Sequence, residues 1–190
     1  MFARTPRLLL RPGWREDAPA LAAAIGDEAI VRNLASAPWP YRIEDAEAFL
    51  SRDQDPRHPS LLVFARTQGA PRLIGGIGIM PSPDGGRELG YWIARRYWGL
   101  GFATEAGRAL LAAAHDTLRL EPLTASHFRD NPASGRVLAK LGFASTGMTV
   151  QRFSAARGET VEAIVYRQRM QEPAGRADRA TGRTLCLEAA

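Results

Sequence analysis

The sequence has 190 residues, of which 45% are apolar and 24% charged, and its formal net charge is +5 at pH 7. This length and composition fit one soluble globular domain with a sizeable core. The single cysteine, Cys186, excludes an internal disulfide and a cysteine metal cluster, and the three histidines lack ligand spacing, so we expect no metal. No apolar run nears membrane-spanning length and no signal-peptide pattern is visible, so we expect a cytoplasmic protein without a membrane partner.

The positive charge is carried almost entirely by arginine, because Lys140 is the only lysine. The chain has no run of basic residues and no basic stripe interleaved with aromatic residues, so we expect no nucleic-acid partner. A basic surface also attracts a polyanionic small ligand, and this is the interpretation we favour.

The first part of the chain predicts a short strand followed by helices. In chain order the predicted elements are a strand at 7–11, two helices within 14–34, a loop at 36–41 and a helix at 43–52. Pro12-Gly13 ends the strand, and Gly26-Asp27 divides the helical stretch. The loop is expected because two prolines flank Trp39.

Strands dominate the middle of the chain. The predicted strands span 61–66, 73–80 and 87–94. Short turns at Gln68-Gly69 and at 81–86 join them. Parallel neighbours need long crossover connections, so these three strands should form an antiparallel meander.

The remainder of the chain alternates helices and strands. The predicted elements are a helix at 101–118, a strand at 123–128, a helix at 132–141, strands at 143–152 and 160–169, and a tail at 171–190. The helical crossover should make the strand at 123–128 parallel to the one before it. Asn131 caps and Pro132 begins the short helix, and the last two strands form a hairpin. We therefore expect one domain over residues 1–170 and a loosely ordered tail over 171–190.

The segment from Glu88 to Glu105 has the organisation of an anion site. A strand-like run leads through Gly99-Leu100-Gly101 into an Ala/Leu-rich helical pattern. The first free N–H groups of a helix point into the preceding turn, where the helix dipole adds partial positive charge. Glycines let the backbone approach a phosphate, and Arg96 would add a permanent charge. A phosphate-bearing ligand is therefore the first hypothesis.

Two common phosphate motifs do not fit this segment. A P-loop requires Gly-Lys followed by Ser or Thr, but Lys140 lies far from the bend. The dinucleotide fingerprint requires a third glycine where this chain has Thr104, and an acidic residue that ends the next strand. Glu121 precedes its predicted strand instead. Both motifs lack residues that their chemistry requires.

The run Arg96-Tyr97-Trp98-Gly99-Leu100-Gly101 fits an Arg/Gln-x-x-Gly-x-Gly/Ala pattern and resembles the pyrophosphate loop of the GNAT superfamily of N-acetyltransferases. The longer run YWGLGFATEA is most similar to the branch that includes ribosomal-protein N-terminal-amine acetyltransferases. The resemblance covers about residues 8–170 in element order and is strongest over 88–143. It implies a single α/β domain with a mixed, mostly antiparallel sheet, whose central parallel pair is splayed around acetyl-CoA.

The resemblance also implies how acetyl-CoA binds. Its pyrophosphate would lie on the amides of residues 99–103, and its pantetheine arm would lie between the two splayed strands. The residues expected to contact it are Ile93, Ala94, Arg96, Gly99, Leu100, Gly101, Phe102, Ala103, Thr104, Asn131 and Ser134.

For catalysis, the family pattern suggests Glu88 as the base, because relatives often carry a carboxylate on this strand. Many relatives use a tyrosine as the acid in the helix after the asparagine, but here Val137-Leu138-Ala139 occupies that region. We therefore assign Ser134 as the acid, with His127 and Tyr91 as alternatives. The residues expected to contact the acceptor are Trp39, Tyr41, Glu88, Tyr91 and His127.

The predicted activity is direct transfer of acetyl from acetyl-CoA to a primary amine. The branch resemblance favours a protein N-terminal α-amine. Two alternatives stay open: acetylation of a small-molecule amine, and a non-catalytic acyl-CoA-binding or regulatory domain, which the missing tyrosine suggests. The sequence also leaves open a homodimer that pairs through the C-terminal hairpin.

Overall fold

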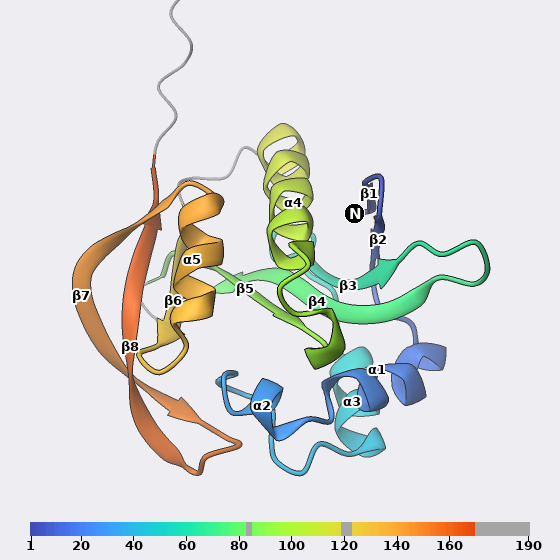
Figure 1. Ribbon diagram of the computed structural model, residues 1–190, viewed down its shortest axis with the longest axis horizontal. Helices are drawn as coiled ribbons and strands as arrows, with labels where there is room; N and C mark the ends of the chain where they lie inside the picture. Colours follow the sequence, from blue (N-terminus) through green and yellow to red (C-terminus); the bar gives the residue numbers. More distant parts are fainter. Residues whose placement is uncertain (83–84, 119–122, 170–190) are drawn as a thin grey trace, which may run out of the picture.

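One mixed β-sheet is the framework of the computed structural model, which describes residues 1–82, 85–118 and 123–169 (Figure 1). Within these residues eight strands follow the order β1-β2-β3-β4-β5-β6-β8-β7. The strands are β1 (Ala3–Arg4), β2 (Leu8–Arg11), β3 (Ser60–Ala65), β4 (Arg72–Pro81), β5 (Arg87–Ile93), β6 (Thr124–Phe128), β7 (Phe143–Ser154) and β8 (Glu159–Gln168). The predicted tail at 171–190, and with it the domain boundary at residue 170, lies outside the described residues.

The helices begin and end close to the predicted positions. They are η1 (Arg15–Asp17), α1 (Ala18–Ile25), α2 (Glu28–Val31), α3 (Ile43–Leu50), η2 (Arg95–Tyr97), α4 (Phe102–Leu118) and α5 (Pro132–Lys140), where η marks a 3-10 turn. The expected break at Gly26-Asp27 is present, and the Asp27 side chain caps α2 by accepting a hydrogen bond from the Ala29 N–H at 2.9 Å. The first helix differs from the prediction, because it opens as a 3-10 turn after Trp14.

The strand pairing confirms the predicted mixed sheet. The meander β3-β4-β5 is antiparallel, and β6, which α4 connects to β5, is parallel to it. The strands β7 and β8 form the expected hairpin. Two features were not predicted: the short β1, and the insertion of β8 between β6 and β7. Both depend on contacts between segments far apart in the sequence, so no local pattern indicates them.

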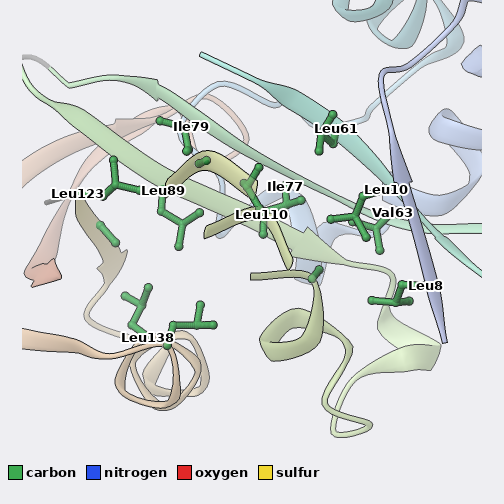
Figure 2. Packing of buried hydrophobic residues seen from close by; sticks show 14 of the residues in the cluster. Leu8, Leu10, Leu61, Val63, Ile77, Ile79, Leu89, Leu110, Leu123 and Leu138 are labelled. Atoms are coloured by element: carbon green, nitrogen blue, oxygen red, sulfur yellow. The ribbon is translucent and has the colours of Figure 1, made fainter. Parts of the chain in front are cut away.

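The sheet buries side chains on both of its faces. In β3, Leu61 belongs to the core under α4 and α5, whereas its neighbour Leu62 belongs to the core against α1 and α3. This alternation follows from the two-residue repeat of a strand. Figure 2 shows the first core, where Leu110 of α4 and Leu138 of α5 pack with leucines and isoleucines of the strands. The two helices are thereby held over the centre of the sheet.

The central parallel pair separates after two residues, as expected from the sequence resemblance. The pairing of β5 with β6 is limited to Glu88 with Thr124 and Leu89 with Ala125. Beyond this point β5 stays paired with β4 as far as Ile93, and β6 stays paired with β8 as far as Phe128. Each strand thus keeps its outer neighbour while the two inner edges part. A gap between β5 and β6 results, and both α4 and α5 begin beside it (Figure 1).

Candidate functional site

A glycine bend joins β5 and η2 to α4. Gly99 and Gly101 have φ values of 77° and 81°, a region that other L-residues rarely adopt. The first hydrogen bond of the helix runs from the Glu105 N–H to the Gly101 carbonyl at 3.0 Å. The N–H groups of residues 102–104 therefore have no acceptor within the helix, and they point toward the bend. This arrangement suits an anion.

A cavity of about 1030 Å³ extends from the glycine bend, along the gap between β5 and β6, to the loop before α3. Most of the predicted site residues line it. At the bend these are Gly99, Gly101, Phe102, Ala103 and Thr104. Along the strands, α5 and the early loop they are Tyr41, Glu88, Tyr91, Ile93, His127, Asn131 and Ser134. The structure thus brings residues from distant parts of the chain to one cavity.

Four predicted contact residues do not line this cavity. Trp39 is 43% exposed on the surface, and the Arg96 guanidinium lies over the Tyr97 ring, 5.1 Å from its centroid. Ala94 is buried with its N–H bonded to the Ile74 carbonyl, and Leu100 is exposed. Their contacts with a ligand stay predictions.

The backbone of β5 presents polar groups to the gap. The bond from the Ala94 N–H to the Ile74 carbonyl, at 2.8 Å, makes Gly75 and Ile93 a pair that is not itself hydrogen-bonded. Because such pairs alternate along an antiparallel ladder, the N–H and C=O groups of Tyr91 and Ile93 point away from β4 and toward the gap. The Ile93 carbonyl accepts a hydrogen bond from the Trp98 indole N–H at 2.6 Å.

Glu88 lies where β5 and β6 are still paired, which is the closed end of the gap, and its side chain is buried, with the residue 6% exposed. Its carboxylate accepts a hydrogen bond from the Ser126 hydroxyl at 2.6 Å and another from the Arg152 guanidinium at 2.7 Å. Its negative charge is therefore compensated by Arg152. The sequence analysis did not identify Ser126 or Arg152, because the three residues lie on different strands and no spacing pattern connects them.

The first turn of α5 carries a hydroxyl pair. The Tyr91 hydroxyl lies 2.7 Å from the Ser134 Oγ and also donates to the Ser134 carbonyl at 3.0 Å. Burial raises the pKa of Tyr91 to about 12, although the hydrogen bond with Ser134 acts in the opposite direction. The Asn131 side chain accepts from the Ser134 N–H at 3.4 Å and caps the helix. Tyr91 and Ser134 are thus held together at the cavity wall.

His127 is 7% exposed beside this turn. Its Nδ1 lies 2.9 Å from the Phe128 carbonyl, which can only accept, so Nδ1 carries the proton. Its Nε2 is buried and has no hydrogen-bond partner in the described part of the chain. A Cβ at Gly135 would lie 2.7 Å from this nitrogen, so only glycine fits there without displacing the ring.

The turn between β1 and β2, here called the N-terminal turn, fixes the glycine bend from outside. The Glu105 carboxylate, in the first turn of α4, accepts from the Thr5 hydroxyl at 2.5 Å and from the Arg7 Nε at 2.7 Å. Arg7 also donates to the Leu100 carbonyl at 3.1 Å. Burial disfavours the charged carboxylate, but these hydrogen bonds outweigh it and lower the pKa of Glu105. Sequence reasoning missed this contact, because Arg7 and Glu105 are 98 residues apart.

Two other features, a metal site and a membrane-spanning helix, are absent from the described residues. In the described ranges no group of three or more His, Cys, Asp or Glu side chains is arranged to hold a metal ion. None of the helices described is long and apolar enough to cross a membrane.

Comparison with known proteins gives consistent matches over most of the chain. A family model described as "Acetyltransferase (GNAT) domain" matches residues 7–144. The uncharacterized N-acetyltransferase YoaA of Bacillus subtilis (strain 168) is 28% identical over 174 residues, which cover 85% of this chain and 93% of YoaA.

Two solved structures have similar folds. The GNAT-family acetyltransferase from Bacillus anthracis aligns with a TM-score of 0.73 at 22% identity and covers 88% of this chain and 97% of its own. The ribosomal L7/L12 α-N-protein acetyltransferase RimL, in complex with coenzyme A, aligns with a TM-score of 0.72 at 17% identity and covers 88% of this chain and 97% of its own. At these identities the structural matches show the fold alone.

We predict that Glu105→Gln lowers the free energy of unfolding by about 1–2 kcal/mol at pH 7, because it removes the charge that Arg7 and Thr5 bind. Since the pKa of Glu105 is lowered in the folded state, its contribution is present above the ordinary value of 4.5 and is lost as the pH falls through the folded-state pKa. Urea denaturation at pH 7 and at about pH 3 measures the difference.

The matched control is Asp116→Asn, on the same helix, where the side chain is 78% exposed. This control should change stability by less than about 0.5 kcal/mol. An equal loss for Glu105→Gln at both pH values would show that the carboxylate charge does not stabilise the bend.

Proposed function

This chain belongs to the GNAT acetyltransferase family, and from that premise we propose that it transfers acetyl from acetyl-CoA directly to the N-terminal α-amine of a protein. The observation that carries the proposal is the position of the glycine bend at the mouth of the gap between β5 and β6. A ligand with a diphosphate and an extended arm has a site for each part in one cavity.

The described residues fit acetyl-CoA, which supplies the acetyl group as a reactive thioester. The helix amides at 102–104 and the open space around Gly99 suit its diphosphate. The N–H and C=O groups of Tyr91 and the N–H group of Ile93 suit an amide-containing arm laid along β5 like an additional strand. The similar fold of RimL, solved with coenzyme A, supports a donor of this class.

In the proposed reaction the chain's main task is to orient and to stabilise charge. The Ile93 N–H, which points into the gap, is the donor we assign to the negative charge that develops on the carbonyl oxygen. Holding the amine beside the thioester supplies much of the remaining acceleration.

Glu88 is the group we assign to the acceptor amine. An α-amine has a pKa of ~8 and is roughly 10% neutral at pH 7, whereas a lysine amine is below about 0.1% neutral. A weak base that takes the proton of the amine, directly or through water, is therefore sufficient for an α-amine. The contacts with Ser126 and Arg152 hold the Glu88 carboxylate in a fixed orientation.

Ser134 is the residue we assign to proton delivery at the leaving sulfur. Its hydroxyl lines the cavity and is held in place by a hydrogen bond with the Tyr91 hydroxyl. The leaving thiol has a pKa of ~8.5, so protonation of the thiolate helps but is not essential, and a hydrogen bond from Ser134, directly or through water, serves this step. The proton that the amine loses is taken up at Glu88 and passes from there to bulk water.

The compensated charge at Glu88 bears on the type of acceptor. Glu88, the carboxylate that we assign to the reacting amine, is neutralised by Arg152, so it offers no uncompensated charge for the second amine of a polyamine; Asp45, Asp53 and Asp55 line the opposite end of the cavity, at α3 and the loop after it. The contact with Arg152 favours an acceptor with one reacting amine. Small-molecule acetylation and CoA binding without turnover are outcomes that the following tests distinguish.

We predict that the purified protein, incubated with acetyl-CoA, acetylates a lysine-containing peptide faster when its α-amine is free than when its N-terminus is blocked. In the blocked peptide the lysine side chain is the only amine. Mass spectrometry locates the acetyl group. A free amino acid and a polyamine complete the panel. Turnover only with a small amine would contradict the proposed acceptor, and CoA binding without any turnover would contradict the proposed activity.

We predict that Glu88→Gln lowers kcat/KM by about 100-fold or more, because the amide cannot accept a proton. Its affinity for CoA, measured by calorimetry, should not change. The matched control is Glu162→Gln, on β8 and outside the cavity, which should keep full activity. Full activity of Glu88→Gln would exclude Glu88 as the base.

We predict that Gly101→Val abolishes the stabilisation by CoA, because valine does not adopt the φ of 81° that the bend requires. For the wild type, ligand at about 100 times its dissociation constant adds ~2.7 kcal/mol to the folded state. Gly142→Val is the matched control, because Gly142 has a φ of 87° and ends α5 away from the bend. This control should lose stability but keep the CoA-induced shift. An unchanged shift in Gly101→Val would contradict the assigned diphosphate site.

A further inference from the structure

A pair of glycines interrupts the sheet face on which Glu88 lies. Residues two apart on a strand point to the same face, so Glu88, Gly90 and Trp92 of β5 share one face. Their antiparallel partners on β4 are, in the same order, Met80, Gly78 and Gly76. This face is turned toward α1 and α3, because Trp92 packs against the core cluster of those helices. The pair of Gly78 and Gly90 therefore leaves bare backbone between Glu88 and Trp92.

The bare backbone of Gly78 and Gly90 and the side chains of Met80 and Trp92 beside it form what we call the glycine slot. All four residues line the large cavity. The Trp92 indole covers the neighbouring glycine of β4, since its Nε1 lies 2.6 Å from the point where a Cβ at Gly76 would stand. The Met80 Cε lies 2.6 Å from the corresponding point at Gly90. None of these residues is charged, so the glycine slot is an apolar part of the cavity.

Met80 is the movable part of the glycine slot. Its terminal methyl group lies over Gly90, although the residue is 46% exposed. An unbranched thioether side chain adapts its shape readily. A group that enters the slot therefore displaces the Met80 methyl toward solvent and keeps contact with the rest of the side chain, while the backbone of β4 and β5 stays in place.

Gly90 lies between the two groups that we assign to the reaction. Glu88, assigned to the acceptor amine, is two residues earlier, about 7 Å along the strand. Ile93, whose N–H is assigned to the carbonyl oxygen, is three residues later, about 10 Å along the strand. An amine that spans these two points passes beside Gly90. The carbon that carries the amine then lies next to the glycine slot, and a side chain on that carbon has the slot as its nearest space.

We propose that the glycine slot selects the first residue of the acceptor, and that this residue carries a bulky apolar side chain such as that of leucine or phenylalanine. The inference rests on the proposed function, because it takes the acceptor to be an α-amine at Glu88. A large apolar side chain loses its contact with water between Trp92 and Met80, whereas an alanine side chain leaves the slot unfilled. A charged side chain would lose its hydration there without an opposite charge as partner.

Peptides that differ only in their first residue test this selection. With acetyl-CoA as donor, kcat/KM should be at least about tenfold higher for peptides that begin with leucine or phenylalanine than for the peptide that begins with alanine. The peptide that begins with aspartate should be the poorest acceptor. Release of the CoA thiol gives the rate, and mass spectrometry locates the acetyl group. Leucine amide is included, because it offers the same amine and side chain without a protein chain.

Gly90→Val tests the slot itself, because its added side chain fills the space. The heavy atom nearest to a Cβ at Gly90 belongs to the flexible end of Met80, so the strand keeps its backbone. The ratio of kcat/KM for the leucine peptide to that for the alanine peptide should fall at least about tenfold, and Gly90→Ala should give a smaller fall. The affinity for CoA, measured by calorimetry, should stay within about twofold.

The matched control is Gly69→Val, in the turn between β3 and β4 and outside the cavity, where an added Cβ meets no atom closer than 3.9 Å. It should keep the ratio. Equal rates for the leucine and alanine peptides, or an unchanged ratio in a Gly90→Val variant that binds CoA, would overturn the slot and leave the proposed function standing. Acetylation of leucine amide but of no peptide, with the same loss in Gly90→Val, would support the slot and overturn the protein acceptor. Absence of turnover with every amine would overturn the proposed function together with this inference.

Discussion

The separation of β5 from β6 after Leu89 is the constraint on which the rest of the structure depends. A sheet normally pairs the backbone groups of neighbouring strands, and buried backbone groups without partners are costly. Here each strand keeps its outer partner, so the inner edges of Tyr91 and Ile93 are left to face a cavity. A ligand with amide groups can pair with that edge. The Ile93 carbonyl accepts a hydrogen bond from the Trp98 indole N–H.

The glycine bend and the start of α4 are arranged around this gap. β5 leads through η2 and the glycine bend directly into α4. The chain itself therefore holds the amides of the helix start next to the end of the gap. The N-terminal turn then fixes the bend through Glu105. The surroundings of Glu88 are assembled differently, because its carboxylate contacts Ser126 of β6 and Arg152 of β7.

The hairpin of β7 and β8 holds Arg152 in place beside Glu88. Its tip contacts the segment after α2, where the Ala155 N–H donates to the Ala35 carbonyl at 2.9 Å and Arg157 donates to the Arg32 carbonyl at 2.8 Å. The arginine that compensates Glu88 is therefore positioned by long-range contacts. These contacts connect the position of Arg152 to the docking of the hairpin.

Local patterns in the sequence were sufficient for the elements and the bend. The glycines at 99 and 101, the cap at Asn131 and the crossover that makes β6 parallel all follow from neighbouring residues, and the structure has each of them. The partners of Glu88 and Glu105 could not be predicted in this way, because side-chain contacts between distant segments leave no local spacing. Arg96 lies over the ring of its neighbour Tyr97, and its contact with a phosphate stays a prediction.

Amide hydrogen exchange of β5, with and without CoA, tests the central claim most directly. If the arm of CoA lies along the open edge of β5, the N–H groups of Tyr91 and Ile93 should exchange more slowly when CoA is bound. The N–H of Trp92, which faces β4, should change little and serves as a control within the strand. Equal protection at all three positions, or none at Tyr91 and Ile93, would contradict the account.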